Sequence, residues 1–462
     1  MNGLTARQEN ALTLRNVLGM DEESAEDFLQ QNLLISVNNS DETGNVLSYY
    51  LKHILTRTVT NISNVLSNNP DIEIIINDAS PRSSSQKVYI NIDTDKIEIS
   101  NNPFVLNNGK TRPHKALVLL GASYASAFIL RQIIGDNTKL PVIQNDLTIE
   151  FGQIFSDLTF LNKEVGLGTI YLAGGGAVGN AFLYALKEFD VAGKLVIADP
   201  DSISEGNLNR CVWFNESMLG KNKAETLVDV ASSSFPKLKL VAHQDFLSTV
   251  SEKKLDERWL RRLVVTVDSR RARRGLQTEI PGEVFDSSTT NIEEVVLHFH
   301  KRPLSDRACL ECIYPQDKIE NAHEQHVADS LGISISDMKE LYVSKTAASK
   351  IMRIYKSYSE KQLMGLSYDT LFKELCGQGK LQIGDEKQIF APFAFVSILA
   401  GTILAMEMIR RITTGQSDYN YWKLSPWVAP VPRLKQVRLK HQDCTFCNNK
   451  TKSDFADRLW SS

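Results

Sequence analysis

A glycine-rich loop between an apolar segment and a helix-forming segment is the strongest constraint in this chain. The stretch AGGGAVGN, residues 173–180, follows the apolar run at 169–172 and matches G-x-G-x-x-G through Gly174, Gly176 and Gly179. A strand, a glycine turn and a helix N-terminus together cradle phosphates, because glycines let backbone amides approach the ligand closely. The loop therefore predicts a nucleotide site. It leaves open whether the ligand is a dinucleotide for redox chemistry or a nucleoside triphosphate.

Strands alternate with helical segments after this loop. We expect strands at 169–173, 194–198, 263–267 and 294–300. Such alternation predicts a parallel, doubly wound α/β sheet of Rossmann type, which binds ligands at the carboxyl ends of its strands. Acidic residues follow two of these strands, namely Asp199 and Asp268.

The segment DPDSISEGNLNRCVWFNESMLGKNKAE, residues 199–225, separates the two ligand hypotheses. A dehydrogenase needs an acidic residue about twenty positions beyond the glycine loop, and Asp199 meets that need. The amide and the two cations that follow suit a triphosphate better, and a strand-end carboxylate suits magnesium. Each of these side chains alone could be a solvated loop residue. The set is Asp199 for ribose, Asn207, Arg210 and Lys223 for phosphates, and Asp268 for magnesium.

Four of the six cysteines form two C-x-x-C pairs, ACLEC at 308–312 and DCTFC at 443–447. Two such pairs in one chain predict a closed, structural zinc site, with redox dithiols or reduced core cysteines as alternatives. The predicted ligands are Cys309, Cys312, Cys444 and Cys447. Cys211 and Cys376 are left for other roles.

Length and charge limit the class of protein. A chain of 462 residues has room for roughly three domains or two large ones. The net charge of −3 gives no polybasic signature, so we expect no nucleic-acid partner. The N-terminus lacks an apolar signal core, which predicts a cytoplasmic protein. The apolar run 390–409 is at the short limit for a membrane span, and we expect a buried helix and no membrane partner.

These motifs, in this order, resemble the ThiF/MoeB/ubiquitin-activating superfamily. The likeness covers about 168–315 and 388–450, and includes D-x-D-x(5)-N-L-N-R, G-x-x-K, and the strand-end VDS with Arg273. It implies adenylation of the C-terminal carboxylate of a ubiquitin-like protein or peptide, with ATP, Mg²⁺ and Zn²⁺ as cofactors. It assigns the glycines to the nucleotide loop and gives the polar residues and cysteines the roles just described. One departure is Cys211, where the family usually has glutamine; we interpret it as a small buried substitute rather than a nucleophile.

Full activation of a ubiquitin-like protein adds a cysteine that accepts the acyl group as a thioester. Cys376 lies after a helical stretch and before a glycine-bearing loop, where the resemblance implies a catalytic cysteine. An inert surface thiol is the alternative. The predicted catalytic set is Cys376, Arg210, Lys223 and Asp268.

The resemblance also implies a domain layout. Residues 1–165, with strands at 71–77 and 87–92 and an apolar helix at 115–135, have α/β character but no nucleotide loop. They are an inactive adenylation-like copy, a dimerisation domain or a partner-holding domain. The remaining parts are the adenylation domain, 166–315 and 387–450, a mostly helical insert, 316–386, whose loop at 376–386 we expect to be mobile, and a tail, 451–462. The layout is most similar to bacterial activating enzymes of antiphage operons.

The expected function is ATP-dependent activation of a ubiquitin-like protein ending in glycine, for transfer to a conjugating-enzyme-like partner by a homodimer. One alternative is a sulfur-carrier or peptide adenylyltransferase without a thioester step. The other is an inactive partner subunit, against which the polar residues Asp199, Arg210, Lys223 and Asp268 argue.

Overall fold

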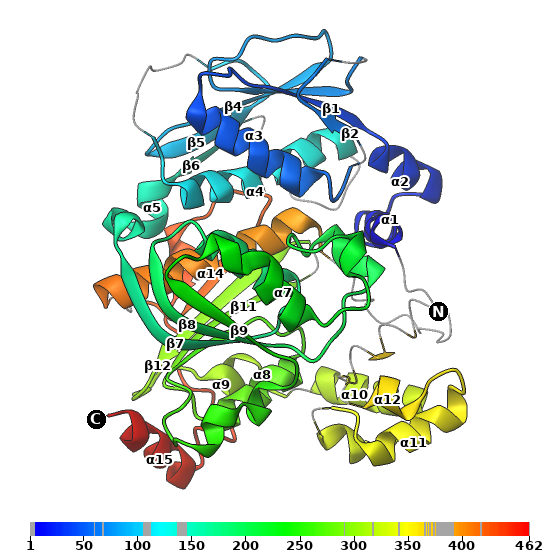
Figure 1. Ribbon diagram of the computed structural model, residues 1–462, viewed down its shortest axis with the longest axis vertical. Coiled ribbons are helices and arrows are strands. Elements are labelled where there is room, and N and C mark those ends of the chain that lie inside the picture. The colour runs from blue at the N-terminus through cyan, green and yellow to red at the C-terminus, as the bar shows by residue number, and fades with distance from the viewer. Residues whose placement is uncertain are drawn as a thin grey trace.

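Two sheets lie one above the other with helices between them (Figure 1). The computed structural model describes residues 5–59, 61–66, 69–104, 112–135, 146–290, 292–316, 318–340, 342–364, 366, 368, 371–372, 375, 392–415 and 418–461.

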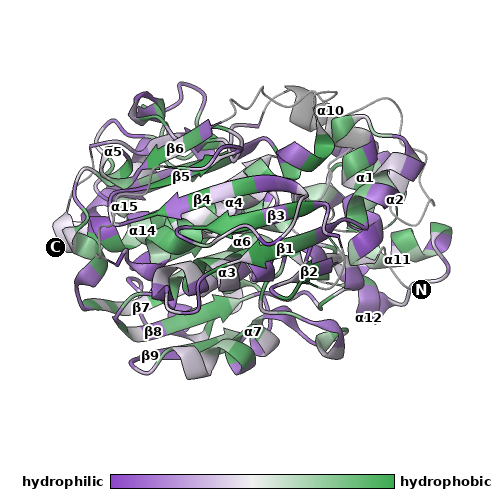
Figure 2. Cartoon of the chain, turned by 90° about the horizontal axis from the view of Figure 1, so that it is seen from above, coloured by the Kyte–Doolittle hydropathy of each residue, from purple (hydrophilic) through white to green (hydrophobic). Residues whose placement is uncertain are grey.

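The first sheet is formed by the N-terminal part of the chain, and its strand order is β2-β1-β3-β4-β5-β6. Strands β2 to β4 are parallel, and β5 and β6 continue the sheet antiparallel. All five residues of β3 are buried, as expected for a central strand. Figure 2 shows the apolar character of β1 and β3 from above. The elements are α1 (Ala6–Leu18), α2 (Glu22–Leu29), β1 (Asn32–Ser36), α3 (Glu42–Leu55), β2 (Asn61–Ser63), β3 (Ile72–Ile76), β4 (Gln86–Ile92), β5 (Lys96–Ser100), α4 (Lys115–Ile134), β6 (Asp146–Glu150) and α5 (Phe151–Phe155).

The second sheet has the order β14-β13-β12-β11-β10-β7-β8-β9. The five neighbouring strands β9, β8, β7, β10 and β11 are parallel, and β12, β13 and β14 continue the sheet antiparallel. The predicted doubly wound α/β fold is therefore confirmed. Strands β9, β11, β13 and β14 were not predicted from the sequence. The elements are β7 (Val165–Ala173), α6 (Ala177–Leu186), β8 (Val191–Ala198), α7 (Lys223–Ala231), β9 (Leu238–His243), β10 (Arg262–Val265), α8 (Arg270–Thr278), β11 (Glu283–Thr290), β12 (Glu294–Lys301), α14 (Ala394–Thr414), β13 (Tyr421–Leu424) and β14 (Lys435–Gln436).

The two sheets share an order of connections. In each, the first strand pairs with the next strand on one side and with a later parallel strand on the other. In each, the connection between two antiparallel strands contains a long buried helix: α4 lies between β5 and β6, and α14 follows the insert and precedes β13. The described part of the first sheet has one crossover strand fewer, because β9 has no counterpart there.

Helices α4 and α14 pack against each other and form a central part of the contact between the two halves. Helix α4 is long and apolar enough to cross a membrane, yet 83% of its apolar window is buried within the protein. Helix α14 covers most of the apolar segment 390–409, and its residues from Ala394 to Arg410 are buried. Its Glu407 forms ion pairs with Arg410 and Arg411 inside the core. Both apolar segments are therefore core helices in this structure.

The insert forms a small helical body beside the second sheet (Figure 1). Its described helices pack around their own apolar cluster, which includes Leu331, Ile351 and Leu371. An arginine of α8 attaches this body, because Arg271 pairs with Glu324 at 3.1 Å. The described helices are α10 (Lys318–Leu331), α11 (Lys345–Ile354) and α12 (Glu360–Leu363). Beyond them, α9 (Leu310–Ile313) precedes the insert and α15 (Lys450–Trp460) ends the described chain.

Candidate active site and metal centre

The glycine loop connects β7 to α6 at the carboxyl end of the parallel strands. Gly174 has φ +100, a left-handed conformation that favours glycine. A Cβ on Gly179 would lie 2.1 Å from the carbonyl oxygen of Gly174, so this helix residue must be glycine for the loop to close. Gly176 caps α6, and a Cβ there would meet no atom within 4 Å. Gly174 and Gly179 are thus required by backbone packing, whereas Gly176 faces the open side where a phosphate would lie.

Asp199 follows β8 and connects the glycine loop to the loop that begins after β8. Its carboxylate accepts hydrogen bonds from the backbone N–H groups of Gly175 at 2.6 Å and Asp201 at 2.9 Å. Only 5% of the residue is exposed. Burial raises the pKa of Asp199 to about 6, although the Lys223 charge opposes the shift. The carboxylate is therefore fixed directly beside the glycine loop, where a ribose would lie in a nucleotide-binding fold of this type.

Lys223, the first residue of α7, points toward the same region. Its Nζ forms an ion pair of 2.9 Å with the carboxylate of Asp201, a residue that the sequence analysis did not single out. Burial alone would lower the pKa of Lys223, but Asp201 and Asp199 raise it above the ordinary value. The cation is thus charged, although a carboxylate of the chain already holds it.

Asn207 and Arg210 lie on the NLNR loop, which we define as residues 204–214. The side-chain oxygen of Asn207 accepts a hydrogen bond from the Ser204 N–H and so closes a capping box. Arg210 donates from Nη1 to the carbonyl oxygen of Gly206 at 2.9 Å and to the side-chain oxygen of Asn209 at 2.6 Å. The loop geometry therefore fixes two of the three side chains predicted to contact phosphates.

Asp268 is exposed just beyond β10. Two residues that support its position are themselves buried: Arg273 donates to the carbonyl oxygen of Val267 and forms an ion pair with Asp286. Tyr314 donates to the same Asp286 carboxylate at 2.7 Å. This buried network holds the strand end that presents Asp268.

Two aromatic residues of the site were missed by sequence reasoning. The ring of Tyr342, from the insert, stacks on Phe246, which follows β9. Burial raises the pKa of Tyr342, and the charges of Asp201 and Asp199 add to the shift, as does that of Asp268. The two predicted carboxylates, Asp199 and Asp268, therefore both act on this ring, as does Asp201. An isolated tyrosine or phenylalanine in a loop has no sequence signal for this placement.

The cysteines divide as follows. Cys211 is 1% exposed, which confirms the predicted burial, and desolvation raises the pKa of its thiol. The charges of Arg210 and Lys223 oppose that shift, so both cations lie near this thiol. A buried thiol with a raised pKa is a poor nucleophile. Cys376 lies outside the described residues, as does the predicted loop at 376–386.

The two C-x-x-C pairs meet across the fold. The Sγ atom of Cys309 lies 3.7 Å from those of Cys312 and Cys444 and 3.5 Å from that of Cys447, and all four Sγ atoms lie within 4.8 Å of one another. A tetrahedron with a Zn–S bond of about 2.3 Å has an S···S edge of about 3.8 Å. Backbone N–H groups point at two sulfurs, His441 to Cys312 and Cys447 to Cys444, both at 3.3 Å. The donor set and its dimensions fit a structural Zn²⁺.

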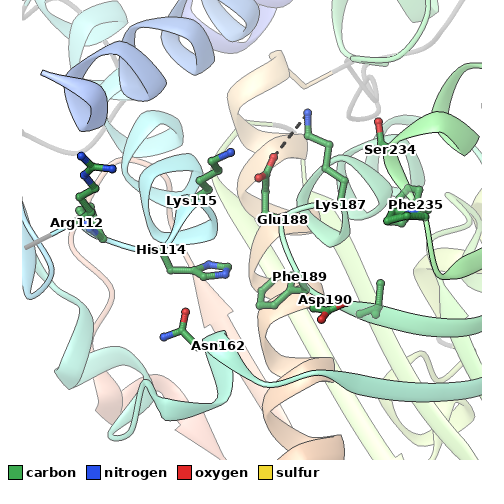
Figure 3. Close-up of a pocket in the computed structure, with 13 residues that line it drawn as sticks. Arg112, His114, Lys115, Asn162, Lys187, Glu188, Phe189, Asp190, Ser234 and Phe235 are labelled. Carbon is green, nitrogen blue, oxygen red and sulfur yellow. Dashed lines mark ion pairs between the residues drawn. The ribbon is translucent and has the colours of Figure 1, made fainter. Parts of the chain in front are cut away.

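A cavity of about 570 Å³ lies elsewhere, between the N-terminal half and the amino ends of β7, β8 and β9 (Figure 3). His114, Lys187 and Glu188 line it, and the last two form an ion pair at 3.7 Å. Because the glycine loop and Asp199 follow the carboxyl ends of β7 and β8, this cavity is distinct from the candidate nucleotide site.

Comparison with family models decides the classification. Residues 163–446 match the ThiF family, and residues 4–156 match the E1 N-terminal domain. The chain belongs to the ThiF family. The predicted resemblance to the ThiF/MoeB/ubiquitin-activating superfamily is confirmed, and this family comprises adenylating, E1-like enzymes.

The ThiF-family chain resembles two curated proteins in part. It is 26% identical over 269 residues to the uncharacterized protein y4jF of Sinorhizobium fredii, covering 53% of this chain and 49% of that protein. It is 33% identical over 81 residues to the NEDD8-activating enzyme E1 catalytic subunit of Saccharomyces cerevisiae, covering 18% of this chain and 27% of that subunit. The matches thus span about half or less of each relative.

Among solved structures, the ThiF-family chain is similar to Escherichia coli MccB. The complex with MccA-N7isoASN has 16% identity and a TM-score of 0.37, covering 61% of this chain and 67% of that one. The complex with ATP has 15% identity and a TM-score of 0.36, covering 60% and 66%.

Proposed function

We propose that this ThiF-family chain activates a ubiquitin-like protein in two steps. The first step joins AMP to the C-terminal carboxylate of that protein, and the second moves the acyl group to Cys376. The observation that carries the proposal is that the glycine loop, Asp199 and Lys223 lie together at the carboxyl ends of β7 and β8, and that Asn180 ties the NLNR loop, which carries Arg210, to the glycine loop. The partial likeness to a NEDD8-activating catalytic subunit supports a protein substrate.

In the first step, a carboxylate oxygen of the substrate attacks the α-phosphorus of ATP. A new P–O bond forms, the bond to the β-phosphate breaks, and pyrophosphate leaves. Asp199 would hold the ribose, and Asn207 would donate to a phosphate. Arg210 and Lys223 would offset the charge that develops on the phosphates, so positioning and electrostatics supply the rate.

The Lys223–Asp201 ion pair fits this scheme. The pair keeps the ammonium within the site, and a triphosphate would compete with Asp201 for it. Asp268, exposed at a strand end, would hold Mg²⁺ together with the phosphates. When bound, that ion would neutralise charge on the phosphate oxygens.

In the second step, a thiolate attacks the acyl carbon of the adenylate, a C–S bond forms, and AMP leaves as its C–O bond breaks. Four of the five described cysteines occupy the metal centre, and the fifth, Cys211, is enclosed. Elimination therefore supports Cys376 as the acceptor. Transfer to a conjugating-enzyme-like partner would complete the reaction.

We assign the N-terminal part, residues 1–165, as a reduced copy of the adenylation fold, because its sheet repeats the connections of the second sheet. The other proposed parts are the adenylation domain (166–315 and 387–450), the insert (316–386) and the tail (451–462). Homodimerisation stays a prediction, and analytical ultracentrifugation checks it. A cytoplasmic location stays a prediction as well, and cell fractionation checks it.

Pyrophosphate exchange tests the first step. A small protein ending in glycine, encoded beside this gene, is added with ATP and labelled pyrophosphate. We expect exchange in the parent and its loss in Asp268→Ala, because the magnesium ligand is gone. Exchange at the parent rate in that variant would show that the magnesium assignment is wrong.

Adduct formation tests the second step. We expect Cys376→Ala to exchange pyrophosphate normally but to form no thiol-sensitive adduct, and Cys376→Ser to trap an ester that resists thiols. Cys211→Ala is the matched control and should retain the adduct. Loss of the adduct in the control alone would reverse the roles of the two cysteines. Exchange without any adduct in the parent would favour a sulfur-carrier or peptide adenylyltransferase.

A further inference from the structure

The NLNR loop is held from the N-terminal half of the molecule. Arg57, two residues beyond α3, reaches across to three carbonyl oxygens of this loop. Its guanidinium donates to Leu208 at 2.5 Å, to Val212 at 2.8 Å and to Phe214 at 3.3 Å. A planar guanidinium can hold several acceptors in fixed directions, which an ammonium cannot do. One side chain therefore fixes both ends of the segment that contains Arg210.

A second connection leads from the same half of the molecule to Arg210 itself. Asn10, on α1, donates from Nδ2 to the carbonyl oxygen of Arg57 at 2.7 Å. Its side-chain oxygen accepts from Nδ2 of Asn209 at 3.0 Å. The side-chain oxygen of Asn209 in turn accepts from Nη1 of Arg210 at 2.6 Å. Asn10 and Asn209 are both buried, so these hydrogen bonds are shielded from water.

The opposite side of the NLNR loop is tied to the glycine loop. Asn180, on α6, donates to the carbonyl oxygen of Gly175 at 2.7 Å and accepts from the Trp213 N–H at 3.1 Å. The NLNR loop is thus clamped between the phosphate cradle on one side and the N-terminal half on the other. Its conformation depends on contacts that neither half makes alone.

We propose that Arg57 and Asn10 are positioning residues for Arg210. The N-terminal half thereby sets the geometry of the phosphate site in the adenylation half. This inference rests on the proposed function, because it takes Arg210 as a phosphate ligand. A residue that only joins the two halves would support stability without changing how Arg210 meets ATP.

Arg82 provides the matched control, because it also lies in the N-terminal half and donates to backbone. Its guanidinium contacts the Ile35 carbonyl oxygen at 2.6 Å and the Ser36 hydroxyl at 2.9 Å, both within the first sheet. Replacing Arg82 with methionine removes a comparable set of hydrogen bonds without touching the NLNR loop.

The experiment is a double-mutant cycle on Mg·ATP binding to the full chain, measured by isothermal titration calorimetry, with melting temperatures alongside. We expect Arg210→Met and Arg57→Met each to raise the Kd roughly 10- to 100-fold, the range of lost charge-assisted hydrogen bonds. We expect the double variant to be no weaker than Arg210→Met, because Arg57 acts through Arg210. Arg82→Met should melt earlier yet bind ATP as the parent does. Arg57→Lys and Asn10→Ala, which are milder changes, should raise the Kd by a smaller factor.

Each result has a distinct meaning. No ATP binding by the parent would overturn the proposed function itself. ATP binding by the parent with additive effects of Arg57→Met and Arg210→Met would overturn the positioning role alone. Normal affinity in Arg210→Met would do the same, because there would be no phosphate contact to position. If Arg57→Met does not fold, parent-like affinity in both Arg57→Lys and Asn10→Ala would contradict the inference.

Discussion

Two glycines of the same loop offer a sharp test, because the structure gives them different tasks. At Gly179 a methyl group would lie 2.1 Å from the Gly174 carbonyl oxygen and 3.0 Å from the Thr266 hydroxyl oxygen. Backbone must therefore shift, and such overpacking costs about 3 kcal/mol. For a domain of this size the melting temperature should fall by roughly 6–12 °C in Gly179→Ala.

Gly176→Ala is the matched counterpart. Its φ of −73 suits alanine, and the new methyl group would meet no atom of the chain within 4 Å. The loss of stability should stay below about 1 kcal/mol, the usual difference between these residues at an N-cap. The methyl group would instead occupy the space of a phosphate. We expect the Kd for Mg·ATP to rise on the order of tenfold, equivalent to about 1.4 kcal/mol.

Thermal unfolding and calorimetric titration of the two variants measure this contrast. If Gly179→Ala melted within about 2 °C of the parent, the close approach to Gly174 would be refuted. If Gly176→Ala bound ATP with the parent's affinity, phosphates would not lie at the N-terminus of α6.

Two further predictions concern the metal centre and Asp199. Elemental analysis should find one zinc per chain. Removing the ion with a chelator, or replacing Cys444 with alanine, should make α15 sensitive to proteolysis, because the ion would join segments distant in sequence. Cys211→Ala is the control and should leave α15 protected. Absence of stoichiometric zinc from the purified protein would contradict this assignment. Burial raises the pKa of Asp199 to about 6, above its value in the unfolded chain. Between about pH 4 and pH 6 the folded chain therefore holds a proton that the unfolded chain has lost. As pH rises through this range, the contribution of Asp199 to the free energy of unfolding falls. Denaturant titrations should show that pH dependence of stability in the parent and not in Asp199→Asn, and equal profiles would refute the pKa shift. Below pH 6, ATP affinity should fall more steeply in the parent than in Asp199→Asn.

Local patterns explain most of what could be predicted. The apolar helix predicted at 115–135 is α4, because its apolar run and the terminal Gly135 are sequence-local signals. The strands around the glycine loop were found for the same reason. Strand β9 was missed, since LKLVAH carries too weak an alternation to separate it from a loop. Its pairing with β8, rather than its own residues, makes it a strand.

The candidate site divides in the same way. The glycine loop and Asp199 are adjacent to predicted strands, so their type and spacing were enough to place them at one edge of a sheet. The contact between Phe246 and Tyr342 could not be predicted, because it joins segments about a hundred residues apart. The ion pair between Lys223 and Asp201 likewise depends on how α7 packs beside β8.

By itself the sequence predicted the glycine loop between a strand and a helix and the ThiF-type family, because both depend on residue types at short, fixed spacings. It also predicted which four cysteines the fold brings together, because C-x-x-C pairs are chemically distinctive. Only the tertiary structure decided how the N-terminal half bears on the site. Asn10 and Asn209 are ordinary polar residues in the sequence, and their hydrogen bond exists because α1 of the N-terminal half packs against the segment Glu205–Asn209. Contacts of that kind depend on how whole helices and sheets pack, and they produce no local sequence pattern at the residues that make them.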